Sequence, residues 1–514
     1  MKTKTPIPKQ PPVDLDSILE IRPTLSLRDY QNKHLTQLLR EDHPRFGELS
    51  DAGTGKTPTV CLYMFAQWHL HGHKTLWVMP LALLRKNREE LLLWSEFAPD
   101  EVVIVHGTPA QRKKQISYPK AKVLLCGFET FSRSWRDILQ AQPQIKVLAG
   151  DEWHLGFSNH AEYNWRGGMD GPRRTFELYQ AMRHIPKMLP MTGTMINGRL
   201  NSAYPFVNLV NPLYYGTYNN FLHWHAILDD FGKPKYWLNH ERLANILADH
   251  SVRISFTQAY GDEPVQIQVE MCEMSTAQRR AYQAMHEEAM LELETIFLEA
   301  PNEAVQVMRC LQIMQHPHTL DIPEGEDSKF KHLEIHVQAA LDSGERLIIF
   351  EVTVPGQERI VEICKKLGAR TGLINGNVKD KGAVDAAFRA NELDVVVCAP
   401  ICAGIGFNWG FVNHMIFSSL SYNDTTFIQN YRRAMRGERK EPLLVTILQY
   451  PKSIDQQIAE IVNAKSRDRM KVQKGNDTSV RIAQSRSQVG NGPLPELTAE
   501  EYWKAFSQVD NYAL

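Results

Sequence analysis

The amino-acid sequence predicts an α/β fold in which two parallel-sheet lobes are separated by a helical insertion. Three observations support this prediction. Short β-branched apolar runs alternate with longer amphipathic stretches, this alternation occurs twice, and the segment between the two series is rich in helix formers. A chain of 514 residues is also too long for one hydrophobic core, which indicates two or three domains.

The first series of apolar runs defines a first lobe over residues 25–215, after a flexible N-terminal leader over residues 1–24. The leader carries prolines where a secretion signal needs an apolar centre, so we do not expect export. The amphipathic stretch 81–97 predicts a helix that covers the sheet. Strands of this lobe are expected at 74–79, 102–105, 122–126, 146–150 and 187–192.

The second series defines a second lobe over residues 326–465, followed by a C-terminal tail over residues 466–514. Between the lobes, residues 216–325 are predicted to form a helical insertion and linker. The stretch 275–300 has strong helix formers without a breaker, and 321–329 is polar and contains proline and glycine. Strands of the second lobe are expected at 346–351, 394–399, 414–419 and 443–448.

The composition is that of an ordinary globular protein, with 43% hydrophobic and 23% charged residues. Basic and acidic side chains number 58 and 59, so a surface for a polyanion has to be a local patch. The seven cysteines form no CxxC pair, which fits reduced thiols in a cytoplasmic compartment and disfavours a zinc site. The sequence has no run of about 18 apolar residues, so we expect no membrane span.

The stretch SDAGTGKT, residues 50–57, ends like a phosphate-binding loop, although Ser50 stands where the usual pattern has glycine. Gly53 and Gly55 let backbone N–H groups close around phosphate oxygens without a Cβ in the way. Lys56 supplies a point charge for the β- and γ-phosphates, and the threonine after it supplies a hydroxyl for Mg²⁺. The predicted nucleotide-binding residues of this loop are Gly53, Thr54, Gly55, Lys56 and Thr57.

The run KVLAGDEWH, residues 146–154, is an apolar strand that ends in two acids, Asp151 and Glu152. ATP hydrolysis after a phosphate-binding loop needs one carboxylate for Mg²⁺ and another that orients and deprotonates the attacking water. We interpret Asp151 as the metal carboxylate, together with Thr57, and Glu152 as the catalytic base. The expected cofactors are therefore ATP and Mg²⁺.

These and further motifs resemble, in order, those of the superfamily-two helicases. DEWH resembles the DExH box, and LRDYQ (27–31) resembles the adenine-reading element, with Gln31 as the contact to the base. MTGTMINGRL (191–200) resembles the coupling motif, VVVCAPICAGIGFNW (395–409) motif V, and QNYRRAMRGER (429–439) motif VI. Among the branches, the Swi/Snf-type DNA-dependent ATPases fit best. The run MRCLQIMQHP (308–317) of this chain resembles their LRQICNHP passage. The resemblance to this branch as a whole covers about residues 25–465.

The resemblance implies two RecA-like lobes that bind ATP between them, so that the site is complete only when the cleft closes. Arg433 and Arg436 match the two motif VI arginines, which stabilise charge on the γ-phosphate in the transition state. Gln429 is expected to sense the phosphate side, and Gly406 of motif V to border the nucleotide. The residues expected to couple the nucleotide state to the grip on DNA are His154, Thr192, Gly193 and Thr194.

Three positions depart from the family pattern. Met195 stands where the coupling motif usually has proline, Trp153 where the box usually has alanine, and Ala403 where motif V usually has glycine. None of these changes removes a charge that hydrolysis needs. They bear on how strongly ATP hydrolysis is coupled to the grip on DNA and on stepping along DNA, rather than on nucleotide hydrolysis itself.

The resemblance places the grip on nucleic acid around motifs Ia, Ib, III and V. Contacts of this kind are to phosphates, so binding should be largely independent of base sequence and sensitive to salt. The loop 163–176, with Arg166, Arg173 and Arg174, either presses on a duplex or is a solvated loop, and the basic run 465–474 is either a solvated helix or a DNA contact. The candidate contact residues are Arg85, Lys86, Arg133 and Asn408.

The sequence therefore predicts a DNA-stimulated ATPase that moves along duplex or branched DNA. The compact chain suggests a bacterial or phage-type protein of branch migration, repair or recombination, with a possible protein partner at residues 216–320 or at the tail. Three alternatives remain open. They are a strand-separating DNA or RNA helicase, an ATP-gated nucleic-acid-binding subunit without catalysis, and an ATPase that remodels a protein–DNA complex.

Overall fold

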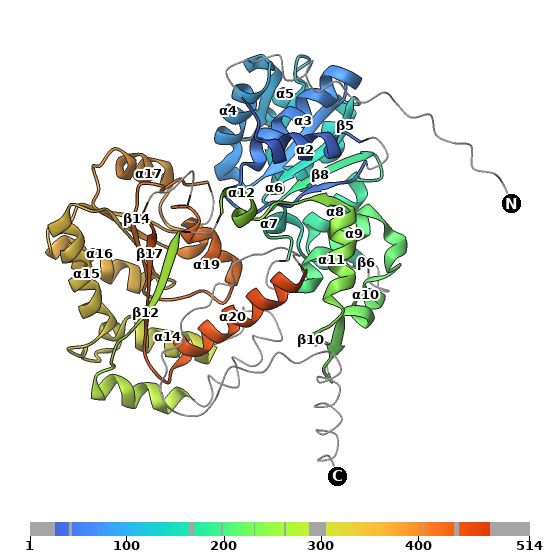
Figure 1. Ribbon diagram of the computed structural model, residues 1–514. Helices are drawn as coiled ribbons and strands as arrows, with labels where there is room; N and C mark the ends of the chain where they lie inside the picture. Colours follow the sequence, from blue (N-terminus) through green and yellow to red (C-terminus); the bar gives the residue numbers. More distant parts are fainter. Residues whose placement is uncertain are drawn as a thin grey trace, which may run out of the picture.

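The chain folds into two α/β lobes, and Figure 1 shows them beside each other, the first in blue to green and the second in yellow to red. Each lobe has a parallel sheet at its centre, with seven strands in the described part of the first lobe and six in that of the second. The predicted fold class of two parallel-sheet lobes is confirmed. The computed structural model describes residues 26–40, 44–163, 169–196, 199–230, 232–261, 264–286, 305–403, 406–435 and 441–472.

The first sheet consists of β1 (Gly47–Glu48), β2 (Lys74–Met79), β3 (Val102–Val105), β4 (Val123–Gly127), β5 (Ile145–Asp151), β8 (Lys187–Met191) and β11 (Ser251–Val252). Their order is β11-β1-β8-β5-β2-β4-β3, and every neighbouring pair is parallel. Along β2, Leu76 and Val78 enter one hydrophobic core while Trp77 and Met79 enter another. Both faces of the sheet are therefore covered, which is why its central strands are continuous apolar runs.

Two sets of helices cover the two faces of this sheet. The core on one face receives side chains from α2 (Asp29–Leu38), α3 (Lys56–His71) and α4 (Leu84–Trp94). The core on the other face receives side chains from α6 (Phe128–Ala141), α7 (Trp153–Phe157), α8 (Arg173–Ala181), α9 (Tyr204–Val210), α10 (Tyr218–His225) and α11 (His240–Asp249). This lobe also contains α5 (Pro109–Ile116), whose last residue enters the same core, and two antiparallel pairs, β6 (Glu162–Tyr163) with β7 (Met169–Asp170) and β9 (Ala226–Leu228) with β10 (Pro234–Trp237).

The second sheet consists of β12 (Val265–Met271), β13 (Leu347–Phe350), β14 (Thr371–Ile374), β15 (Val395–Cys398), β16 (His414–Phe417) and β17 (Leu443–Gln449). The strand order is β12-β17-β16-β13-β15-β14, again parallel throughout. Its helices are α14 (Val305–Gln315), α15 (Lys329–Ser343), α16 (Val354–Lys366), α17 (Lys381–Arg389), α18 (Pro400–Ala403), α19 (Asp424–Tyr431) and α20 (Ile454–Val472). In the described part of the chain, no helix combines the length and the apolar character that crossing a membrane requires.

The segment 216–325 is not simply the helical insertion that the sequence predicts. It gives β11 to the edge of the first sheet, beside β1, and β12 to the edge of the second, beside β17. The chain thus passes from lobe to lobe over residues 253–264, which include the short helix α12 (Phe256–Tyr260). The strand β11 is two residues long, too short to carry a pattern. The strand β12 has the apolar–polar alternation typical of a half-buried strand, a signal that the prediction of a helical insertion overlooked. Of the predicted helix 275–300, residues 287–300 lie outside the described part.

A buried ion pair fastens two helices of the second lobe together. Lys329, at the start of α15, has its Nζ 2.7 Å from Oδ2 of Asp455 in α20, and both side chains are nearly inaccessible to solvent. The same ammonium donates a hydrogen bond of 2.6 Å to the carbonyl of Ser418, which follows β16. Because both charges are out of water, each depends on the other for compensation.

Candidate active site

The loop between β1 and α3 has the backbone that a phosphate-binding loop needs. Gly53 and Gly55 have φ angles of +88° and +80°, which side chains with a Cβ rarely adopt. A Cβ on Gly55 would also lie 2.8 Å from Nε2 of Gln31. The helix α3 begins at Lys56, so its N-terminus faces the loop, and Thr57 is half-buried in the first turn.

The side chain of Lys56 lies across the mouth of this loop. Its Nζ donates hydrogen bonds of 2.8 Å to the carbonyls of Ser50 and Asp51. Thr54 closes the loop from within, since its Oγ1 donates to the carbonyl of Asp51 at 2.8 Å. The ammonium is thereby held where a phosphate entering the loop would meet it.

The helix α2 is tied to the loop by two of its first residues. The Gln31 amide donates to the carbonyl of Gly55 at 2.7 Å and accepts from the backbone N–H of Arg28 at 2.8 Å. The Tyr30 hydroxyl donates to the carbonyl of Thr54 at 2.5 Å. Gln31 therefore lies beside the nucleotide loop, and its contact with an adenine base stays a prediction.

The two acids of the box lie where β5 ends. Asp151 accepts hydrogen bonds from the Asn87 side-chain amide at 2.7 Å and from the backbone N–H of Glu152 at 2.8 Å. Burial and the neighbouring Glu152 carboxylate raise the pKa of Asp151, against the opposing effects of Asn87 and the Lys56 ammonium. A buried carboxylate beside a second one fits a divalent cation, whose charge would compensate both.

Glu152 has a strained backbone and two neighbours of different kinds. Its φ of +47° lies in the left-handed region, which is uncommon for residues other than glycine. One carboxylate oxygen is 3.6 Å from Nδ1 of His154, and the other is 3.9 Å from a guanidinium nitrogen of Arg433, in the second lobe. The proposed base thus lies at the contact between the lobes.

A chain of polar contacts connects Glu152 with the second lobe through the coupling motif. His154 Nδ1 lies 2.8 Å from the Thr192 hydroxyl and 2.9 Å from the Thr194 hydroxyl. Burial lowers the pKa of His154 to about 3, so its imidazole is neutral at physiological pH. Across the cleft, the Gln429 amide donates to the Thr194 hydroxyl at 3.4 Å.

Gly193 allows the coupling motif to approach the phosphate-binding loop closely. A Cβ on Gly193 would lie 3.0 Å from the backbone nitrogen of Ala52 and 3.2 Å from the carbonyl oxygen of Ser50. Both of those atoms belong to the backbone, which could not easily move aside. The three predicted coupling positions 192–194 therefore lie against the nucleotide loop.

Of the motif VI arginines, the structure places Arg433 in the cleft, while Arg436 lies outside the described residues. The preceding Arg432, to which the sequence assigned no contact, has Nη1 3.1 Å from Oδ2 of Asp51 in the phosphate-binding loop. Both described arginines are about 5% exposed. Motif VI thus reaches the first lobe with two consecutive guanidinium groups.

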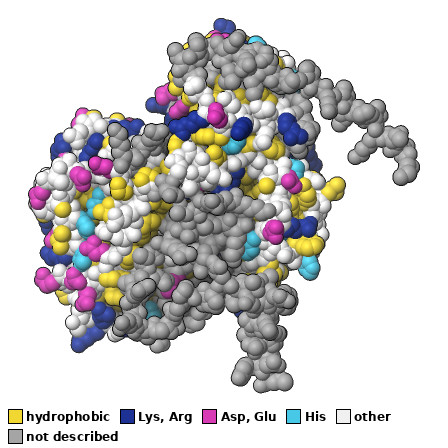
Figure 2. All heavy atoms as spheres, in the orientation of Figure 1, with side chains coloured by type: hydrophobic (Ala, Val, Ile, Leu, Met, Phe, Trp, Pro, Cys, Tyr) yellow, Lys and Arg dark blue, Asp and Glu magenta, His cyan; other side chains and the backbone are white. Residues whose placement is uncertain are grey.

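Of the residues predicted to contact nucleic acid, Arg85, Arg133 and Asn408 are exposed, whereas Lys86 lies between the lobes. Arg85 and Arg133 are exposed on α4 and α6, and Asn408 is exposed with its Oδ1 accepting from the N–H of Gly410 at 3.4 Å. Lys86 instead donates to the carbonyl of Gly406 at 3.5 Å, across the lobes. Figure 2 shows dark blue Lys and Arg side chains on the first lobe in this view, near magenta acids.

Motif V approaches the first lobe at Gly406 as well. This glycine has a φ of +85°, and a Cβ on it would lie 3.0 Å from Cδ2 of Leu83. The structure therefore places Gly406 against the residues around the start of α4, and its role beside the nucleotide stays a prediction. The side chain of the atypical Ala403 lies outside the described part.

The loop 163–176 is described only at its ends, because residues 164–168, which include Arg166, lie outside the described part. Arg173 has its Nε 3.7 Å from a carboxylate oxygen of Glu177, and Arg174 has its Nε 3.5 Å from a carboxylate oxygen of Glu129. Arg174 and Glu129 form a surface ion pair, whereas Glu177 is buried, so both arginines contact acids of the first lobe itself.

Sequence reasoning missed two further polar groups of the site. Asn87 was given no role in the nucleotide site, whereas its side-chain amide donates a hydrogen bond to Asp151. A signal was present, because Asn87 lies with Leu84 and Leu91 on the buried stripe of α4, where a polar residue needs a partner. Ser50 is the second, since its hydroxyl donates to Glu48 and accepts from the N–H of Ile254 at 3.1 Å.

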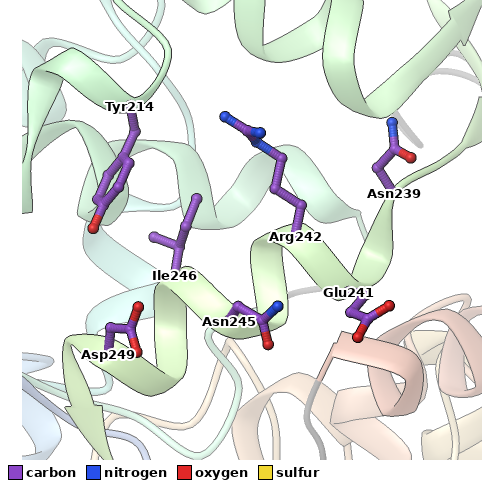
Figure 3. A pocket seen from close by; sticks show the side chains of 7 residues that line it. All are labelled: Tyr214, Asn239, Glu241, Arg242, Asn245, Ile246 and Asp249. Carbon is purple, nitrogen blue, oxygen red and sulfur yellow. The ribbon is translucent and has the colours of Figure 1, made fainter.

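A separate pocket of 530 Å³ lies on the first lobe, at α11 (Figure 3). Its Arg242 stacks on the ring of Trp224, with 4.3 Å between the guanidinium carbon and the ring centroid. Acidic, basic and amide groups are mixed in its lining, and none of the predicted site residues takes part. The lining residues are Tyr214, Asn239, Glu241, Arg242, Asn245, Ile246 and Asp249.

Comparison with known proteins gives a family match over more than half of the chain. The SNF2-related domain family matches residues 30–319. The "Uncharacterized ATP-dependent helicase MG018" of Mycoplasma genitalium is 20% identical over 456 residues, which are 86% of this chain and 41% of that protein. The "Transcription regulatory protein SNF2" of Saccharomyces cerevisiae is 20% identical over 479 residues, 85% of this chain and 27% of that protein. The chain spans less than half the length of these curated relatives.

Two solved structures are similar to this chain to different degrees. A structure of S. cerevisiae Dbp5, bound to RNA and ADP BeF3, is 12% identical with a TM-score of 0.50, covering 86% of this chain and 88% of that one. The Sulfolobus solfataricus SWI2/SNF2 ATPase core, in complex with dsDNA, is 20% identical with a TM-score of 0.39, covering 85% and 90%. At 12% identity, the likeness to Dbp5 is one of fold.

Proposed function

The chain belongs to the SNF2-related domain family, and from this premise we propose that it is an ATP-dependent translocase acting on duplex or branched DNA. ATP would be hydrolysed in the cleft between the two lobes, and repeated closing and opening of that cleft would move the protein along DNA. The observation that carries the proposal is the approach of Arg433 in the second lobe to Glu152 in the first, at 3.9 Å. A base and a guanidinium from different lobes form one site only when the lobes meet.

Each group of the cleft has a distinct part in this reaction. Lys56 and the backbone N–H groups of the loop would hold the β- and γ-phosphates, and Thr57 and Asp151 would hold Mg²⁺, which neutralises phosphate charge. Glu152 would orient the attacking water and accept its proton. Arg433 would stabilise the charge that develops on the γ-phosphate, as would Arg436.

The contacts around His154 suggest how nucleotide state reaches the DNA grip. His154 is neutral and contacts both Thr192 and Thr194, and the Gln429 amide of the second lobe contacts Thr194. A shift of Glu152 on hydrolysis would therefore be passed to the coupling motif and across the cleft. DNA contacts would come from exposed basic side chains such as Arg85 and Arg133, and would address phosphates rather than bases.

The ATPase rate with four nucleic acids tests the proposal. Blunt duplex DNA, single-stranded DNA, a four-way junction and RNA would be compared at one salt concentration, with Glu152→Gln as the matched inactive control. We expect the duplex or the junction to stimulate turnover most. Stimulation by RNA or single strands alone would refute a duplex translocase and favour a strand-separating helicase.

Two further assays separate the remaining functions. Displacement of a third strand from a triplex without unwinding of a forked duplex supports translocation, and branch migration of the junction would give the finer role in DNA repair or recombination. Nucleic-acid binding without any turnover that depends on Glu152 would instead identify an ATP-gated binding subunit.

A further inference from the structure

Asp51, within the phosphate-binding loop, contacts three separate parts of the chain with one carboxylate. Its Oδ2 is 3.1 Å from Nη1 of Arg432 in the second lobe and accepts a hydrogen bond from the backbone N–H of Phe256 at 3.2 Å. Its Oδ1 is 3.1 Å from Nη2 of Arg253. The loop, the second lobe and the segment that joins the lobes therefore meet at this side chain.

The joining segment, residues 253–264, is also bound to the loop by its backbone. The Asp51 N–H donates to the carbonyl of Ile254 at 3.0 Å, and the Ile254 N–H donates to the hydroxyl of Ser50 at 3.1 Å. This segment begins directly after β11 and leads directly into β12. The loop is therefore attached to the strands at which the chain leaves one lobe and enters the other.

The pairing of Asp51 with Arg432 takes place out of water. Asp51 is 1% exposed and Arg432 is 5% exposed. The ring of Phe256 lies beside the pair, with its centroid 5.9 Å from the guanidinium carbon of Arg432. Separating a buried guanidinium from a buried carboxylate costs free energy, so the pair favours the position of motif VI seen here.

Holding Arg432 also fixes the residue that follows it. Arg432 and Arg433 lie in one turn at the end of α19, where the Arg433 N–H donates to the carbonyl of Asn430 at 3.2 Å. The Arg433 carbonyl in turn accepts from the N–H of Trp409 at 2.8 Å. Movement of Arg432 away from Asp51 would therefore carry Arg433 away from Glu152.

We propose that Asp51 is a positioning residue for ATP hydrolysis, which docks the second lobe on the phosphate-binding loop through Arg432 and thereby places Arg433 at Glu152. This inference rests on the proposed function, since it concerns the same cleft. Asp51 itself would touch neither the γ-phosphate nor the attacking water. Its loss should therefore lower kcat while the loop still binds ATP.

The test compares Asp51→Asn, Arg432→Gln and the double variant with the unmodified chain. Each single change should lower the DNA-stimulated kcat by about 10- to 100-fold, as misplacement of a catalytic group by about 1 Å does, while the KM for ATP changes by less than about threefold. Because both changes break one contact, the double variant should be no slower than the slower single variant. Asp51→Glu should restore part of kcat. Arg370→Gln, in an exposed ion pair of the second lobe, serves as the control for loss of a charge.

The outcomes separate this inference from the function on which it rests. If Arg433→Ala abolishes turnover but Asp51→Asn and Arg432→Gln leave kcat unchanged, the shared site stands and the positioning role is refuted. Additive losses in the double variant, or a KM that rises as much as kcat falls, would also refute it. If Asp51→Asn does not fold, Arg432→Gln and Asp51→Glu decide between the same outcomes. An unmodified chain without any turnover would overturn both proposals.

Discussion

Replacing Asn87 by alanine should weaken the hold of the site on Mg²⁺. The Asn87 amide donates to Oδ2 of Asp151 at 2.7 Å, and the backbone N–H of Glu152 holds the other oxygen at 2.8 Å. Without the amide, the Asp151 carboxylate is free to rotate away from the cation, and a buried acceptor loses its donor. The defect should therefore appear in the dependence of turnover on magnesium.

The size of the effect follows from the kind of hydrogen bond. A hydrogen bond to a charged group contributes about 1.5 to 3 kcal/mol, which corresponds to about 10- to 100-fold in an equilibrium constant. Changes to groups that orient metal ligands typically reduce metal affinity by about the same factor. We therefore expect the Mg²⁺ concentration for half-maximal ATPase activity to rise about 10- to 100-fold in Asn87→Ala, with most of kcat recovered at saturating Mg²⁺.

The assay is phosphate release at fixed ATP over a series of Mg²⁺ concentrations. Met79→Leu is a matched control, because the sulfur of Met79 lies 3.3 Å from the same amide nitrogen and its loss should leave the magnesium dependence unchanged. An unchanged half-saturating Mg²⁺ concentration in Asn87→Ala would refute the reasoning. A fall in kcat that saturating Mg²⁺ does not restore would refute it as well.

Three further predictions concern the cleft and the two lobes. Lys56→Ala and Glu152→Gln should each lower turnover by at least about 100-fold in a phosphate-release assay, and a smaller loss would contradict their roles. Burial lowers the pKa of His225 to about 4, so its contribution to the free energy of unfolding should be full above pH 6.5 and fall as the pH drops towards 4. In His225→Gln, the slope of the unfolding free energy against pH should be smaller by about 1.4 kcal/mol per pH unit. Urea unfolding at a series of pH values measures this slope. Lys329→Met should cost about 3 to 5 kcal/mol of unfolding free energy by leaving Asp455 uncompensated, and a loss in the double variant with Asp455→Asn equal to the sum of the two single losses would contradict a shared ion pair.

The sequence predicted the central strands well because burial on both faces makes them continuous apolar runs. The predicted strands 74–79 and 102–105 coincide with β2 and β3, and the others agree with the structure to within about two residues at either end. The edge strand β11 was missed because two residues carry no pattern, and β12 was missed although its alternation of apolar and polar residues is a strand signal. The sequence could not show that one segment completes both sheets.

In the site, the sequence predicted residues that belong to motifs but not the groups that position them. Lys56 lies across the phosphate-binding loop, and Glu152 and Arg433 meet at the contact between the lobes, while their roles in hydrolysis stay predictions. The partners Asn87 and Asp51 were missed because their contacts join positions 64 and 381 residues apart in the chain. Only the packing of α4 on β5, and of one lobe on the other, brings these groups together.

The central claim is that one ATP site is completed by residues from both lobes. The most direct test is Arg433→Ala, with nucleotide affinity measured by titration and turnover by phosphate release in the presence of duplex DNA. The account predicts that ATP affinity is retained within a few-fold while hydrolysis falls by about 100-fold or more. Hydrolysis at the unmodified rate in Arg433→Ala would contradict the account.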